Sequence, residues 1–164
     1  MEAEAMSADT TNDEPTESTE ATKIVRNHML AAVAAGVVPV PLIDIAILTG
    51  LQMRMVRALA RHYEVEFAEQ RVKSLIGTLV SLGAVATIGS LLKAAVPGAR
   101  GLFGLGSLAL PAATTYAVGR VFIKHFESGG TVWTFDPSRA KEEFAEEVEA
   151  GKQVVEQSFA GVRP

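Results

Sequence analysis

Asp44 is the residue of this sequence best placed to do chemistry, because it is the single charge in an otherwise apolar stretch, residues 29–53. An acid in such a setting is a candidate proton or ion site. The alternative, which we favour, is that Asp44 caps the helix after Pro41 or pairs with a base elsewhere in the protein. Gln52 and Arg54 follow on the same predicted helix and would extend a polar seam. A small channel or transporter subunit that uses Asp44 is therefore our third functional hypothesis, after a membrane-embedded adaptor or scaffold and a soluble protein-interaction domain.

Other catalytic, metal or cofactor chemistry has no recognisable pattern. The three histidines are scattered without a partner at metal-ligand spacing, and the chain has no cysteine. Gly101, Gly104 and Gly106 lie among Leu and Phe and lack the lysine that completes a phosphate-binding loop. No arrangement matches a Ser/His/Asp signature. We therefore expect a protein that is not an enzyme and has no catalytic residue, cofactor or metal.

The charges divide the chain into three parts. Residues 1–22 carry seven acids and no base, residues 23–126 eleven bases and four acids, and residues 127–164 eight acids and four bases. The basic middle part is also the most apolar, a combination that indicates a membrane, whereas a nucleic-acid binder would be basic overall. We expect, in this order, a disordered acidic tail, an apolar helical membrane domain, and a linker with an acidic amphipathic helix.

Two prolines divide the first apolar stretch. Pro39 and Pro41 each remove a backbone donor and bias the preceding residue away from helix. The stretch therefore predicts two helices, residues 23–36 and 42–62, whose apolar parts are too short to cross a hydrocarbon core of ~30 Å comfortably. A re-entrant hairpin, or a helix pair buried in protein, satisfies both constraints.

Residues 74–92 and 101–119 are two uncharged segments of nineteen residues each. Their length favours a transmembrane hairpin over a buried hairpin in a soluble protein. Small residues recur at helical spacing on one face of each segment, so we expect the two faces to pack together. The residues singled out for this packing are Gly77, Ser81 and Ala84 in the first segment and Gly106, Ala109 and Ala113 in the second.

The basic residues of the middle part predict an orientation in a bilayer. With a re-entrant first hairpin and a spanning second one, nine bases lie on one side, and Lys93 and Arg100 lie on the other. This asymmetry predicts a bacterial inner-membrane protein with both termini in the cytoplasm.

Residues 137–158 are predicted to form an amphipathic helix that begins at the Asp136–Pro137 pair. One face of this helix is an apolar stripe and the opposite face is mostly glutamate, which anionic lipid repels. We therefore expect the helix to dock on protein, and on the chain's own bundle in preference to a partner. Its apolar stripe consists of Ala140, Phe144, Val148, Gly151, Val155 and Phe159.

An ordered run of residues within 38–67 resembles the YcjF-like, GTPase-associated bacterial family of unknown function. The family pattern is a Pro-x-Pro-like start, an early Asp, a Leu-x-x-x-Gln-x-x-Met helix and a Leu-Ala-x-x-Tyr end. The matching residues here are Pro39, Pro41, Asp44, Leu48, Gln52, Met55, Leu59, Ala60 and Tyr63. The resemblance covers about residues 25–126. It implies a membrane-associated, non-catalytic all-α domain, with any GTPase partner acting in trans.

Together these observations predict an all-α integral membrane protein with two apolar helical hairpins and a C-terminal amphipathic helix. The expected function is a non-catalytic, membrane-embedded adaptor or scaffold. Its expected partners are the lipid bilayer, a GTPase or another protein in trans, and a second copy of the chain, but no nucleic acid. The alternative is a soluble, tightly packed all-α protein-interaction domain.

Overall fold

The computed structural model describes residues 17–35, 41–93 and 106–160, with side chains for residues 19–34, 46–83 and 109–160. All regular secondary structure in these ranges is α-helical, which confirms the predicted all-α class. The helices are α1 (Glu17–Ala35), α2 (Pro41–His62), α3 (Glu69–Lys93), α4 (Gly106–Glu127) and α5 (Lys141–Ala160).

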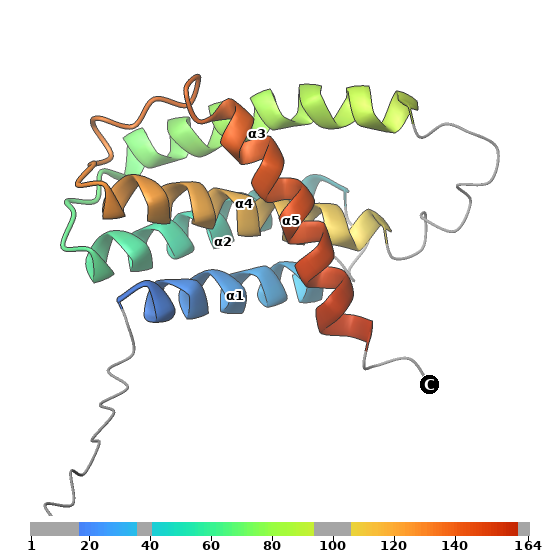
Figure 1. Cartoon of the computed structure of the whole chain (residues 1–164), viewed down its shortest axis with the longest axis horizontal. Helices are drawn as coiled ribbons and strands as arrows, with labels where there is room; N and C mark the ends of the chain where they lie inside the picture. The colour runs from blue at the N-terminus through green and yellow to red at the C-terminus, as the bar shows by residue number, and fades with distance from the viewer. Residues whose placement is uncertain (1–16, 36–40, 94–105, 161–164) are drawn as a thin grey trace, which may run out of the picture.

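The first four helices form an up-and-down bundle, and α5 crosses it diagonally (Figure 1). Helices α1 and α3 run in one direction, and α2 and α4 run in the other. Helix α4 contacts each of the other four helices, and its contact with α5 is the most extensive in the bundle. The position of α4 therefore determines how the remaining helices are arranged.

Helix α1 begins at Glu17, so residues 17–22 of the predicted disordered tail are helical instead. The reason is an apolar stripe that begins at Ala21 and continues through Val25 and Met29, all of which are buried. These spacings of four residues place the stripe on one helix face, which packs against α4. The acidic and Thr-rich composition of this segment concealed the start of the stripe.

The prolines divide the first apolar stretch as predicted. Helix α1 ends at Ala35 and α2 begins at Pro41, while the intervening residues 36–40 lie outside the described residues. The second uncharged segment belongs to a helix that continues to Glu127 and therefore includes charged residues.

The predicted integral membrane architecture is not supported. Within the described residues, no helix combines the length and the mean hydropathy that crossing a bilayer requires.

Helix α5 docks on the chain's own bundle, as predicted. It buries Phe144, Val148, Gly151 and Val155 against α3, α4 and α1. It begins at Lys141, later than predicted, because residues 137–139 form a turn. In that turn the Asp136 carboxylate accepts the backbone N–H of Ser138 at 2.9 Å.

Glycines set the distance between α5 and the bundle. A Cβ atom on Gly151 would lie 2.9 Å from both the Cα and the carbonyl oxygen of Ala113 in α4, closer than real Cβ contacts allow. Gly83 of α3 likewise faces the ring of Phe144 directly. The crossing therefore brings the backbones of α4 and α5 into contact.

We expect Gly151→Ala to lower the free energy of unfolding by about 1–3 kcal/mol, because overpacking against Ala113 outweighs the better helix propensity of alanine. Gly77→Ala is the matched control: Gly77 is an exposed helical glycine with nothing within 4 Å of an added Cβ. This change should raise the free energy by about 0.5–1 kcal/mol. Denaturant titration measures both values, and the reverse ranking would contradict a close crossing at Gly151.

Candidate functional site

The four bundle helices share one charge-poor half. Helices α1 and α3 run opposite to α2 and α4. The C-terminal ends of α1 and α3 therefore lie at the same end of the bundle as the N-terminal ends of α2 and α4. We define the charge-poor half as residues 29–35, 41–53, 74–92 and 106–119. These segments of the sequence contain one charged residue, Asp44. Four helix segments that together hold a single charge therefore meet at one end of the bundle.

The described surface of the charge-poor half carries no charge. Its exposed residues are small or apolar, and the largest of them, Ile47, is 46% exposed. Because this surface is uncharged, its contact with lipid would not require the burial of a charged side chain. The exposed residues are Ala31, Ala34, Ala46, Ile47, Gly50, Ser74, Gly77, Thr78 and Ser81.

The remaining parts of the same four helices are base-rich. We define the basic half as residues 17–28, 54–62, 69–73 and 120–127, which contain nine bases and four acids. Arg57 pairs with Glu69 at 2.9 Å and lies 4.7 Å above the Phe67 ring. The nine bases are Lys23, Arg26, Arg54, Arg57, Arg61, Arg71, Lys73, Arg120 and Lys124.

Three residues of the family-like run join α2 to α4. The Gln52 side-chain amide, 2% exposed, donates to Thr115 Oγ1 at 3.4 Å, and Thr115 in turn donates to the Pro111 carbonyl at 2.9 Å. The Met55 sulfur lies 3.1 Å from where a Cβ on Gly119 would be. Residues of this run therefore pack α2 against α4, and we call this line of contacts the packing seam.

Tyr63 continues the seam at the end of α2. Its hydroxyl donates to the Glu127 carboxylate at 3.0 Å, and its ring lies 6.0 Å from that of Phe126. Residues further along α2 contact residues further along α4, as expected for two helices that run in the same direction.

The other residues of the run are described only in part. Pro39 lies outside the described residues. Pro41 begins α2 and Asp44 lies near its start, but their side chains are outside the described set. An ion or proton role for Asp44 therefore stays a prediction.

Those small residues of the predicted hairpin whose surroundings the structure describes do not meet each other. Gly77 and Ser81 lie on the exposed side of α3, whereas Ala113 of α4 packs against Gly151 of α5 and Ala109 packs in the cluster around Met29 and Val155. The α4 face is covered by α5, so it is not available to α3. Ala84 lies within α3 and Gly106 begins α4, and both belong to the part described by backbone alone.

Ion pairs connect the start of α5 to the basic half. Lys124 Nζ lies 2.9 Å from Glu143 and 3.3 Å from Glu147, and Arg120 Nε lies 3.7 Å from Glu147. Glu143 is the main cause that raises the pKa of Lys124 above its ordinary value; burial opposes the shift and Glu147 adds to it. The stabilisation is complete below the ordinary lysine pKa and is lost only as pH rises through the raised value. These pairs therefore persist near neutral pH.

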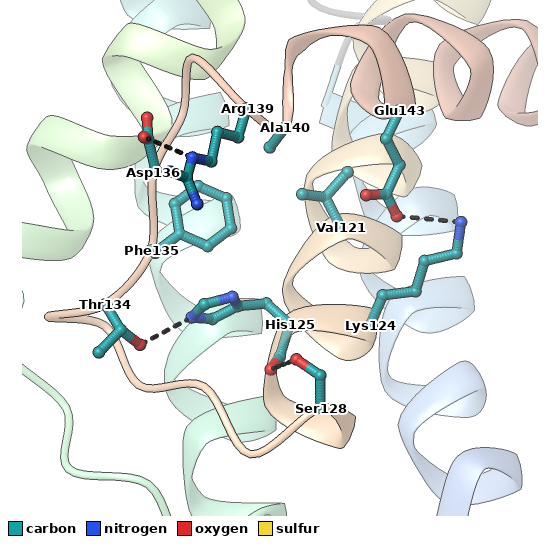
Figure 2. Close-up of a pocket in the computed structure, with 10 residues that line it drawn as sticks. All are labelled: Val121, Lys124, His125, Ser128, Thr134, Phe135, Asp136, Arg139, Ala140 and Glu143. Atoms are coloured by element: carbon teal, nitrogen blue, oxygen red, sulfur yellow. Dashed lines mark hydrogen bonds and ion pairs between the residues drawn. The ribbon is translucent and has the colours of Figure 1, made fainter.

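A cleft with a volume of about 310 Å³ lies between the end of α4, the following loop and the start of α5. Figure 2 shows the residues that line it. Its charged side chains are paired with one another, Lys124 with Glu143 and Arg139 with Asp136 at 3.6 Å. His125 is held by the Thr131 carbonyl at 2.9 Å. The cleft thus presents no convergent set of free charges, and it marks incomplete packing beneath the start of α5.

The loop before α5 is fixed to the bundle. The Arg71 guanidinium donates to the carbonyls of Val132 and Phe135 at 3.4 Å each, and the Phe135 ring stacks on Phe122 at 4.6 Å. Trp133, between these anchors, is 60% exposed. The anchored loop therefore presents the single tryptophan of the chain to solvent at the basic end of the bundle.

Comparison with known proteins identifies the family. Residues 5–149 match the family described as a domain of unknown function, DUF697. The protein belongs to the DUF697 family. A relative, magnetosome membrane protein 22 of Magnetospirillum gryphiswaldense, is 37% identical over 137 residues, which cover 80% of this chain and 70% of that protein. No solved structure matches.

We expect Thr115→Val to lower the free energy of unfolding by about 1–3 kcal/mol, because it leaves the buried Gln52 amide without its hydroxyl partner. Replacing both groups, with Gln52→Met and Thr115→Val together, should cost less than the single change, since no buried polar group then lacks a partner. Denaturant titration compares the two variants. An equal or larger loss in the double variant would show that the pair is not the source of the effect.

Proposed function

We propose that this DUF697 protein is a non-catalytic, membrane-associated adaptor that enters the bilayer with its charge-poor half. The observation that carries the proposal is that four helix segments with a single charge among them, Asp44, meet at one end of the bundle, while nine bases lie in the basic half of the same helices. Lys93, the last residue of α3, lies just beyond the charge-poor segment of that helix. Apolar surface next to a base-rich surface is the arrangement that anionic membranes attract.

The lengths of two of the four charge-poor segments support partial insertion. Segments 41–53 and 106–119 are ~20 Å long at 1.5 Å per residue, against a hydrocarbon core of ~30 Å. They would pass the middle of the bilayer without crossing it, and the bases would then lie near the lipid head groups. The related protein is named as a magnetosome membrane protein, which supports membrane association in the family.

The basic end would then face the cytoplasm and a protein partner. That end carries the start of α1 and the anchored loop with exposed Trp133, a residue type enriched at binding hot spots. A GTPase in trans is the partner implied by the resemblance, and a second copy of the chain is the other candidate. Co-purification of wild type and of Trp133→Ala from the native membrane tests this part of the proposal.

A packed protein-interaction domain that does not touch lipid is the second candidate function. It is favoured by the docking of α5, which already buries the apolar stripe of the C-terminal helix within the chain. A channel that uses Asp44 is the third hypothesis, and comparing ion flux in wild type and Asp44→Asn tests it.

Flotation with vesicles of phosphatidylcholine and phosphatidylglycerol tests membrane entry. We expect Ile47→Lys with Ser81→Lys to weaken binding by more than about tenfold, because a lysine within the bilayer costs about 2.5–3.5 kcal/mol. Both positions are exposed, so the fold should tolerate the change.

The matched control adds the same charge at exposed positions of the basic half, with Asn27→Lys and Gln70→Lys. This variant should bind at least as tightly as wild type, since its new charges would meet head groups. Equal gains in both double variants would indicate surface attraction without insertion. Absence of binding by wild type would favour the interaction domain.

A further inference from the structure

Helix α5 obstructs the surface that the proposed function requires. Its second half packs over the charge-poor half, where Gly151 contacts Ala113 of α4, and Val155 packs with Met29 and Ala112. The exposed residues of α5 near these contacts include Glu149 and Glu156. As long as α5 stays docked, inserting that side of the bundle would carry glutamates into lipid, which is costly.

We propose that α5 is a displaceable cover, docked in the free protein and released when the charge-poor half enters an anionic membrane. This inference depends on the proposed membrane association. Release would expose the apolar residues of α4 and α1 beneath α5 and would remove its acids from the inserting side.

The charges of α5 supply a reason for release at an anionic surface. The helix contains six glutamates and two lysines, so anionic lipid repels it, whereas the basic half of the bundle is attracted. Its ion pairs use Lys124 and Arg120, which belong to that same basic half. Lipid phosphates would compete with Glu143 and Glu147 for these two bases.

The contacts of the loop before α5 indicate where a hinge for α5 would lie. Arg71, His125 and the Phe135–Phe122 stack fix the loop as far as Phe135. Beyond this point residues 137–139 form a turn, and the cleft of Figure 2 lies beneath the start of α5. Motion at residues 137–140 would therefore swing α5 away while the loop stays attached.

Spin labels test the displacement directly. The chain has no cysteine, so Asn27→Cys and Gln157→Cys, at exposed sites on α1 and α5, place one label on each body. In solution we expect one narrow distance between the labels. Vesicles of phosphatidylcholine and phosphatidylglycerol should give a longer and broader distribution, and phosphatidylcholine alone should give no change.

Charge-matched variants test the trigger. Glu143→Gln with Glu147→Gln removes the acids that pair with α4, and should raise affinity for the anionic vesicles about tenfold and lengthen the label distance even without lipid. Glu142→Gln with Glu146→Gln makes the same charge change at exposed positions and should leave the distance in solution unchanged.

The outcomes separate this inference from the proposed function. If the protein binds vesicles and the distance between the labels does not change, α5 is not a displaceable cover, whereas the proposed membrane association still holds. Equal effects of the two glutamate variants would overturn the ion-pair trigger. No binding to vesicles at all would remove the proposed function and the cover together.

Discussion

Close approach of helix backbones at α4 is the constraint on which the rest of the structure depends. Gly119 leaves room for Val25 of α1 and Met55 of α2, and Ala113 meets the backbone at Gly151 of α5. Larger residues at these crossings would separate α4 from at least one neighbour, because interiors are packed too densely to absorb the extra volume. Small residues therefore allow a single helix to contact four others, and they place α5 against the bundle.

The lengthwise division of charge depends on this topology. Helices α1 and α3 have their bases in their N-terminal halves, except for Lys93 at the C-terminal end of α3, and α2 and α4 have theirs near the C-terminal ends. Because the helix directions alternate, the base-rich ends of all four helices lie at one end of the bundle. If all four helices ran in one direction, base-rich and charge-poor segments would lie side by side at both ends. Each uncharged segment is continuous with a charged one in the same helix, as in α3, which begins at Glu69, before the uncharged segment starts. The boundaries of an apolar run are therefore not the boundaries of a helix.

Local structure and the docking of α5 on the bundle were predictable from the sequence, whereas the particular residues that meet between helices were not. The prolines divided α1 from α2, and the apolar stripe of α5 became its buried face, because both effects act within a few residues. Gly77 and Gly151 illustrate the limit: both are helical glycines, yet one is exposed and the other lies against Ala113. Which of them packs depends on where another helix crosses. Likewise Gln52 was noted as a polar neighbour of Asp44, but its partner Thr115 lies 63 residues away.

The bases that would bring the protein to a membrane include the bases that hold α5. Because its glutamate partners raise the pKa of Lys124, this residue keeps its charge throughout the neutral range, and the pair cannot be released there by deprotonation of the lysine. Another anion can replace the glutamates without any change in protonation. A surface dense in phosphate supplies such anions and also repels the remaining acids of α5. Docking of α5 and attraction to lipid are thus opposing uses of the same charges, which would couple membrane contact to exposure of the surface beneath α5.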